Sequence, residues 1–224
     1  MTFNRWIAGA GLLAALGTVA LALGQRSGPS TAIRAPEQRP TLALLTSLPL
    51  VFGEDFGLEG GGSAALTRLD QRYNVVPIGV ADATSLSGQH LLLMAHPRAQ
   101  PAGALVDLDR WVRKGGRVLL LADPRLDWES GRTLGDKLRP PPAFADTGLL
   151  AHWGLTLSGP TPDGRGLLAV TRSGRSCDVL NEGLVARCRI GRGAATIIAD
   201  ADFLNGEPQG LGPMMDELAR LESR

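Results

Sequence analysis

Residues 90–121 read HLLLMAHPRAQPAGALVDLDRWVRKGGRVLLL, and this stretch decides the fold. Two apolar runs, 90–95 and 117–121, have the length and composition of buried strands. Between them, Leu105, Leu108 and Val112 recur at helical spacing over residues 101–114, and the Gly pair that follows ends the helix. The stretch therefore predicts a strand–helix–strand unit with parallel strands.

Similar segments continue this alternation on both sides. The sequence predicts strands at 41–46, 73–78, 166–170 and 194–198, and helices at 64–71, at 144–153 and from Pro213 onward. The strand at 73–78 suits a sheet edge, since Pro77 cannot donate a ladder hydrogen bond. Residues 123–142 are Pro-rich and irregular. We predict an α/β fold, a three-layer sandwich with a mainly parallel sheet and an antiparallel hairpin.

The first 40 residues differ from the rest. Residues 6–24 carry no charge and would span about 28 Å as a helix, close to the thickness of a bilayer core. They predict a transmembrane anchor or, alternatively, a signal peptide cleaved near Ala22. We divide the chain into this segment (1–26), a Pro/Ser-rich linker (27–40) and one α/β domain (41–224). The expected location is the inner membrane, single-pass, with the domain in the periplasm; cleavage would instead secrete the domain to the periplasm.

Charge and cysteine content narrow the function. The net charge is +1 and no long Lys/Arg run occurs, which argues against nucleic acid binding. Cys177 and Cys188 flank a plausible hairpin turn at 181–183 and would face each other across two strands, which favours a disulfide. The alternative is a pair of buried free thiols.

Polar turns follow four predicted strands. Because the carboxyl ends of parallel strands meet at one edge of a sheet, these turns should form one polar rim. A rim of this kind can bind a ligand or partner, or support acid–base chemistry through His96, Asp123 and Asp202. It can also consist of ordinary strand exits whose side chains close turns. The rim residues are Ser47, His96, Arg98, Asp123, Arg125, Asp200 and Asp202.

Several segments together resemble the gliding-motility-type ABC transporter auxiliary domains. The resemblance implies a membrane-tethered, extracytoplasmic domain with a flavodoxin- or amidotransferase-like fold. It also adds Glu54 to the candidate binding residues. An amidotransferase would need a cysteine at the strand exit where this chain has His96, so the resemblance implies a non-catalytic relative. The segments are 45–50 with 53–54, 108–124, 152–155, 191–193 and 199–204.

We therefore predict a non-catalytic accessory domain of a membrane transport complex. Its expected partners are ABC permease or ATPase subunits or other inner-membrane proteins, and the sequence predicts no catalytic residue, cofactor or metal. The alternatives are an extracytoplasmic hydrolase or amidotransferase-like enzyme using His96 with Asp123 or Asp202, and a purely structural envelope protein.

Overall fold

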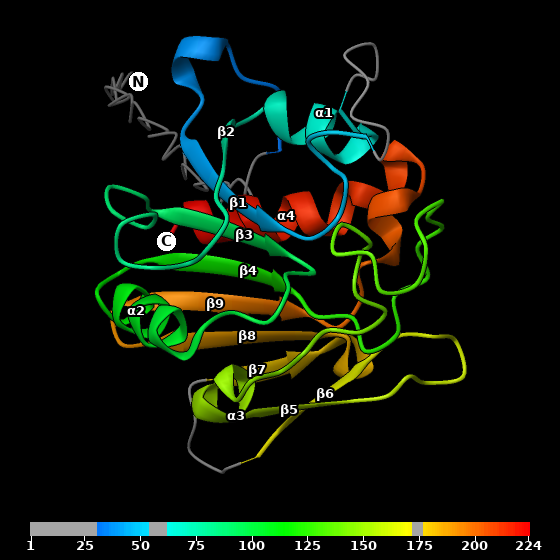
Figure 1. Ribbon diagram of the computed structural model, residues 1–224. Coiled ribbons are helices and arrows are strands. Elements are labelled where there is room, and N and C mark those ends of the chain that lie inside the picture. Colours follow the sequence, from blue (N-terminus) through cyan, green and yellow to red (C-terminus); the bar gives the residue numbers. More distant parts are fainter. Residues whose placement is uncertain (1–30, 54–61, 172–176) are drawn as a thin grey trace, which may run out of the picture.

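The computed structural model describes residues 31–53, 62–171 and 177–224. Within these ranges the chain forms an α/β fold around a seven-stranded sheet, with a separate two-stranded hairpin (Figure 1). The strands are β1 (Thr41–Thr46), β2 (Asn74–Pro77), β3 (Leu91–Ala95), β4 (Arg117–Leu121), β5 (Leu155–Ser158), β6 (Leu167–Val170), β7 (Cys177–Leu180), β8 (Val185–Ile190) and β9 (Gly193–Ile198). The helices are α1 (Ala64–Asp70), α2 (Ala102–Arg113), α3 (Leu149–Trp153) and α4 (Gly212–Glu222), with short 3-10 helices η1 (Pro36–Gln38), η2 (Asn181–Gly183), η3 (Asp202–Asn205) and η4 (Pro208–Leu211).

The sheet has the order β2-β1-β3-β4-β9-β8-β7. Its first five strands are parallel, and β8 and β7 continue it antiparallel. The mainly parallel sheet and the antiparallel hairpin are thus confirmed, as is the place of β2 at the edge. The parallel strands follow the 2-1-3-4-5 order of flavodoxin-like sheets. The narrower likeness to amidotransferases stays a prediction.

Both faces of the sheet are covered (Figure 1). Strand side chains alternate between faces, so Leu42 and Leu44 of β1 pack with α1 and α4, while Ala43 and Leu45 pack with α2 and α3. The buried apolar residues therefore form two clusters, one on each side. This arrangement is the predicted three-layer sandwich.

The predicted helix at 144–153 is wrong in its first half. Helix α3 begins only at Leu149, because Gly148 adopts a left-handed conformation with φ 99°. The carboxylate of Asp146 accepts hydrogen bonds from the backbone N–H groups of Gly148 and Leu150, at 3.1 and 3.3 Å. Asp146 thus holds the turn that precedes the helix instead of belonging to it.

The hairpin of β7 and β8 carries the predicted disulfide. Cys177 and Cys188 are paired in register, with their Cα atoms 4.0 Å apart, and their sulfur atoms are bonded. The turn at 181–183 forms where the sequence places it. The disulfide is confirmed.

The described part of the predicted linker lies against the domain. The guanidinium of Arg72, 3% exposed, donates to the carbonyl oxygen of Ala32 at 3.3 Å and to Glu222 of α4 at 2.8 Å. Arg34 forms an ion pair with the same carboxylate at 2.7 Å. The segment that leads into β1 and the end of α4 are therefore held together at Glu222.

The predicted membrane segment, 6–24, and the rest of 1–30 lie outside the described residues. Among the residues that are described, no helix combines the length and apolarity that crossing a bilayer requires.

Candidate functional site

The rim begins where β1 and β3 end side by side. The strand order reverses between them, since β2 flanks β1 and β4 flanks β3, and open α/β sheets bind ligands at such points. The hydroxyl of Thr46 donates to the Ala95 carbonyl oxygen at 2.9 Å. The hydroxyl of Ser47 donates to the His96 carbonyl oxygen at 2.5 Å. Both hydroxyls thus fasten the two strand exits to each other.

His96 occupies the strand exit of β3 and is fully buried. Its backbone has φ 45°, an uncommon conformation for a residue other than glycine. The ring nitrogen Nε2 lies 2.9 Å from the Pro141 carbonyl oxygen, which can only accept, so Nε2 carries the proton. Burial lowers the pKa of His96, against the raising effects of the Pro141 hydrogen bond and the Asp123 charge. Burial therefore favours the neutral imidazole, and Nδ1 is buried with no hydrogen-bond partner among the residues that the structure describes.

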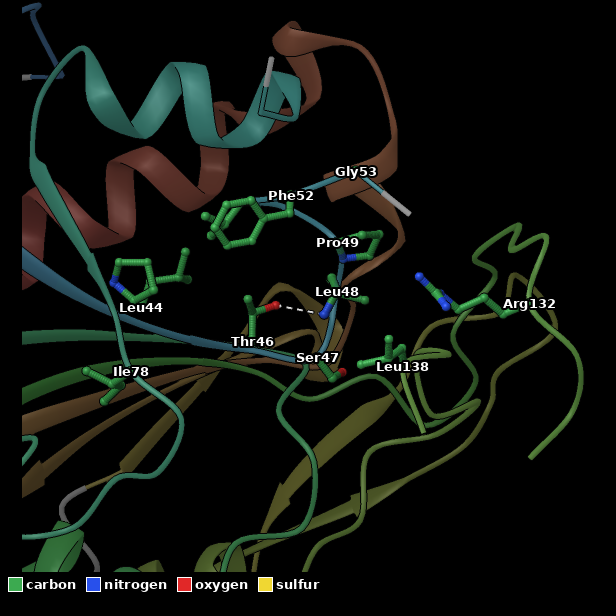
Figure 2. Close-up of a pocket in the computed structure, with 12 residues that line it drawn as sticks. Leu44, Thr46, Ser47, Leu48, Pro49, Phe52, Gly53, Ile78, Arg132 and Leu138 are labelled. Atoms are coloured by element: carbon green, nitrogen blue, oxygen red, sulfur yellow. Dashed lines mark hydrogen bonds between the residues drawn. The ribbon is translucent and has the colours of Figure 1, made fainter. Parts of the chain in front are cut away.

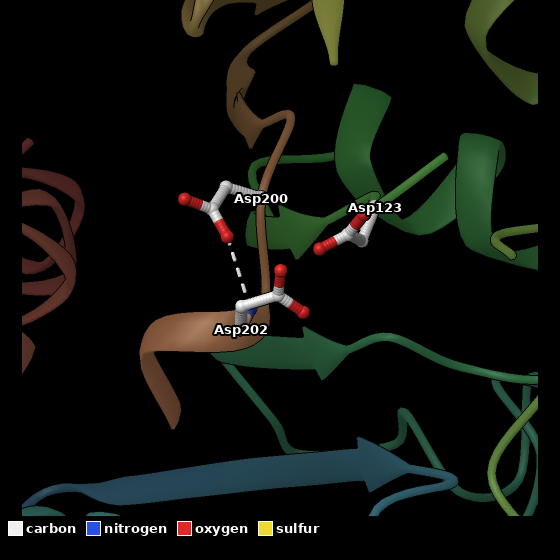
Figure 3. Close-up of side chains that lie close together, drawn as sticks. All are labelled: Asp123, Asp200 and Asp202. Atoms are coloured by element: carbon white, nitrogen blue, oxygen red, sulfur yellow. Dashed lines mark hydrogen bonds between the residues drawn. The ribbon is translucent and has the colours of Figure 1, made fainter. Parts of the chain in front are cut away.

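Three carboxylates gather at the exits of β4 and β9 (Figure 3). Asp123, Asp200 and Asp202 each have an oxygen within 4.8 Å of the others. Asp123 is 1% exposed, and its two oxygens accept from the backbone N–H groups of Arg125 at 2.8 Å and Ala201 at 2.9 Å. These bonds hold the two strand exits together.

The other two carboxylates also accept backbone hydrogen bonds, Asp200 within its own turn and Asp202 from a separate loop, and burial together with neighbouring charges disfavours their ionisation. Asp200 accepts from the N–H of Asp202 at 2.9 Å, and Asp202 accepts from the N–H of Asp127 at 2.7 Å. Burial raises the pKa of Asp202 to about 6, and the charges of Asp123, Asp200 and Asp127 act in the same direction. Burial and the Asp123 charge also raise the pKa of Asp200.

This cluster has the oxygen ligands that hard cations such as Mg²⁺ prefer. Each carboxylate, however, has a structural task, because together they accept four backbone N–H groups at the exits. Two of these bonds close turns and the other two join separate segments, and together they account for the positions of the carboxylates.

The two arginines point to the surrounding loops. Arg98 is exposed and donates to the Arg139 carbonyl oxygen at 2.5 Å. Arg125 is exposed, and its guanidinium lies beside Gly164 in the turn between β5 and β6. The structure thus joins Ser47 to His96 and gathers the three aspartates, whereas the arginines extend away from both groups. Glu54 lies outside the described residues.

A partly apolar pocket of about 240 Å³ opens beside the β1 exit (Figure 2). Thr46 and Ser47 lie on its floor, Ile78 comes from the β2 exit, and Phe52 and Leu138 form part of its wall. Phe52 is 63% exposed and Leu138 is 54% exposed. Exposed apolar side chains around a hollow are typical of contact sites for partners or ligands.

Sequence reasoning missed the wall of this pocket. Phe52 and Leu138 lie in segments without periodicity, so no strand or helix pattern marks them. The one available signal was the presence of Leu134 and Leu138 in the Pro-rich stretch 123–142, which no strand or helix pattern explains. Leu134 is 89% exposed, which shows that this loop carries apolar side chains to the surface.

Comparison with protein families shows to which family the chain belongs. The model of a family described as an ABC-type uncharacterized transport system, made up of ABC transporter auxiliary proteins, matches residues 39–159. The match covers more than half of the chain. The chain belongs to this ABC transporter auxiliary family. The matched region includes β1–β5 and the exits that carry Ser47, His96 and Asp123.

No curated protein matches this auxiliary protein. Among solved structures, it is similar to the exo-β-1,4-mannosidase Op5Man5 from Opitutaceae bacterium strain TAV5 (14% identity, TM-score 0.43, 83% of this chain and 36% of that one). It is also similar to a β-galactosidase from Bacillus circulans sp. alkalophilus (16%, 0.40, 78% and 31%). A cytoplasmic protein from Salmonella typhimurium LT2 is a third (12%, 0.39, 81% and 96%). The chain spans about a third of the length of the two glycosidases.

Proposed function

We propose that this ABC transporter auxiliary protein is a non-catalytic, extracytoplasmic domain that binds a protein partner of its transport complex at the strand carboxyl-terminal rim. The observation that carries this proposal is the pocket beside the β1 exit, with Phe52 and Leu138 exposed on its wall. A partner that covers apolar surface of this kind removes it from water, which favours binding. The partner expected from the family is a permease or ATPase subunit, or another inner-membrane protein of the same system.

The state of the polar groups supports a non-catalytic role. A general acid or base must reach its substrate within hydrogen-bond distance. His96 is fully buried and bonded to Pro141, and both oxygens of Asp123 are bonded to backbone N–H groups. The His96 ring is thus buried against the loop that carries Pro141, and Asp123 joins the exits of β4 and β9.

Two features support an extracytoplasmic location. The Cys177–Cys188 disulfide is typical of proteins in oxidising compartments. The uncharged stretch 6–24 predicts an anchor or signal peptide that would carry the domain across the membrane. Protease added to spheroplasts should therefore digest the domain while a cytoplasmic marker stays intact; protection of the domain until lysis would contradict this location.

Affinity purification tests the partner. The full-length chain, tagged at its carboxyl terminus, is recovered from detergent-solubilised membranes and its partners are identified by mass spectrometry. We expect an ABC permease or ATPase, with the bait's residues 6–24 retained. A bait cleaved near Ala22 that brings no membrane protein would overturn the proposal.

Variants locate the contact. Phe52→Ser with Leu138→Ser removes the apolar wall, and we expect the partner to be lost while the melting temperature is kept. Val106→Ser is the matched control, because Val106 is 55% exposed on α2, away from the rim. Equal recovery with both variants would exclude this pocket as the contact.

The enzyme alternative has its own test. A hydrolase screen of the purified chain, repeated with Asp202→Asn, should find no turnover. Activity that the substitution abolishes would establish catalysis at the rim. A chain with neither turnover nor partner would support the structural alternative.

A further inference from the structure

We infer that the edge of the sheet opposite the rim is a docking surface for anionic phospholipid headgroups. This edge holds the amino-terminal ends of the parallel strands and the last turn of α2. Its cations, which we call the basic edge, come from the end of α2, the α2–β4 turn, the start of β4, the end of β8 and the β8–β9 turn. They are Arg113, Lys114, Arg117, Arg189 and Arg192.

The backbone brings these cations together from two distant parts of the chain. The N–H of Arg192 donates to the Arg113 carbonyl oxygen at 3.0 Å, and the Arg192 guanidinium donates to the Lys114 carbonyl oxygen at 3.0 Å. In the sheet register, Arg117 of β4 and Arg189 of β8 both pair with Ala194 of β9. The two turns therefore form one continuous surface.

Much of this positive charge is not neutralised. Among the described residues, Lys114, Arg189 and Arg192 are exposed and form no ion pair with a carboxylate. Arg113 is paired with Asp109 at 2.7 Å, and its side chain is 48% exposed. The basic edge can thus attract anions from solution.

The opposite edge carries both signs of charge. The three carboxylates of Asp123, Asp200 and Asp202 lie at the rim, at the carboxyl ends of the same strands, and Arg98 and Arg125 are exposed at the same exits. The basic edge differs from the rim because Lys114, Arg189 and Arg192 have no ion pair among the described residues. A negatively charged surface attracts such an edge more strongly than an edge of mixed charge.

The course of the chain indicates which surface that is. Arg34, just after the stretch that includes the apolar residues 6–24, shares the Glu222 carboxylate with Arg72. The backbone oxygen of Glu222 in turn accepts from the Arg117 guanidinium at 2.9 Å. Arg34 is thus held, through Glu222, at the same edge of the sheet as Arg117 of the basic edge. A membrane segment that precedes Arg34 in the sequence would place a lipid surface nearest to this edge.

The two lysines of the chain allow a direct test. Lys114 belongs to the basic edge, and Lys137 is exposed in the loop that lies at the rim. The full-length chain is added to nanodiscs of phosphatidylcholine, with or without phosphatidylglycerol, and acetylated with sulfosuccinimidyl acetate. Mass spectrometry then gives the acetylation rate of each lysine.

We expect phosphatidylglycerol to slow acetylation of Lys114 by about fivefold, the factor for one basic residue at an anionic surface. Lys137 should react at the same rate on both lipids. Protection should vanish at about 0.5 M salt, where the screening length is only a few ångströms. Arg189→Glu with Arg192→Glu should abolish it, while the matched pair at the rim, Arg98→Glu with Arg125→Glu, should retain it.

Other outcomes would overturn the inference. Equal Lys114 rates on the two lipids, or equal protection of both lysines, would show that the basic edge does not face anionic lipid. Protection by duplex DNA but not by lipid would assign the surface to nucleic acid. The double variant of Arg189 and Arg192 must match the original chain in melting temperature and in Lys114 reactivity without lipid. If it does not, the single substitution Arg189→Gln, which leaves Lys114 in place, is measured instead. Partner recovery in the purification above is a separate result, so either proposal can fail alone.

Discussion

Replacing Asp202 by asparagine would relieve the repulsion within the carboxylate cluster. Burial, supported by the charges of Asp123 and Asp200, raises the pKa of Asp202 from 3.8 to about 6. Asparagine removes the charge and keeps the side-chain oxygen that accepts from the Asp127 N–H. The variant should therefore be more stable than the original chain wherever Asp202 is ionised.

The magnitude follows from the pKa difference between the folded and unfolded states. A shift of about two pKa units corresponds to about 3 kcal/mol, since one unit is about 1.4 kcal/mol. Asp202 is partly exposed, so solvent screening reduces this to about 1.5 kcal/mol. For a domain of this size, such a gain raises the melting temperature by about 3–6 °C.

The pH dependence gives the sign of the effect. The folded state binds the Asp202 proton more tightly than the unfolded state does. The stability that this proton contributes to the original chain is therefore fully present below pH 3.8 and is lost as the pH rises through about 6. The variant's advantage should therefore appear at pH 7 and be absent near pH 4.

Thermal unfolding between pH 4 and pH 8, followed by circular dichroism in EDTA, measures this difference. EDTA keeps divalent cations from competing with the proton. Glu129→Gln, an exposed residue of the adjoining loop, controls for the loss of one negative charge. An advantage that is equal at pH 4 and pH 7, or none at pH 7, would refute the argument.

Three further substitutions test the framework around the site. Replacing Cys177 and Cys188 by serine opens a loop with a sequence separation of 11 and should lower the free energy of unfolding by about 3 kcal/mol in urea titration, with reductant then having no further effect. Glu222→Ala leaves the buried Arg72 guanidinium without its carboxylate and should lower the free energy of unfolding by about 3 kcal/mol. Trypsin should then cut faster at the basic residues that precede β1, so an unchanged cleavage rate would contradict this. Glu217→Ala, 6% exposed and bonded to two arginines, should cost a similar amount by thermal unfolding, and a loss below about 1 kcal/mol would show that the pair contributes little.

Sequence patterns predicted the framework of the fold because its elements have strong periodicity. The helix of residues 101–114 and its flanking apolar runs appear as α2, β3 and β4, with differences of one residue at the ends. The disulfide followed from the hairpin register alone. The overextended helix at 144–153 shows the limit, since the turn that delays α3 depends on side-chain hydrogen bonds and on a left-handed glycine. Strand β5 was missed although its four residues, Leu155–Ser158, alternate between apolar and polar side chains.

The site was predictable only in part. The contact of Ser47 with His96 and the gathering of the three aspartates followed from the rule that parallel strands end at one edge. The directions of Arg98 and Arg125 did not, because loops from 123 onward and the β5–β6 turn decide where those side chains lie. Phe52 and Leu138 line the same pocket across a wide sequence separation, and no local pattern records that arrangement.

The position of β9 separates the limits of recognition from those of folding. This strand lies between β4 and β8, yet it comes from beyond residue 159, where the family match ends. A chain cut at that residue would leave the ladder groups of β4 unpaired along one whole side, next to side chains from Val118 to Leu121 that are otherwise fully buried. It would also lack α4, which covers one face of the sheet. Such a fragment would carry an open, apolar strand edge and should aggregate. The stretch that the family match covers is therefore not a unit that folds by itself.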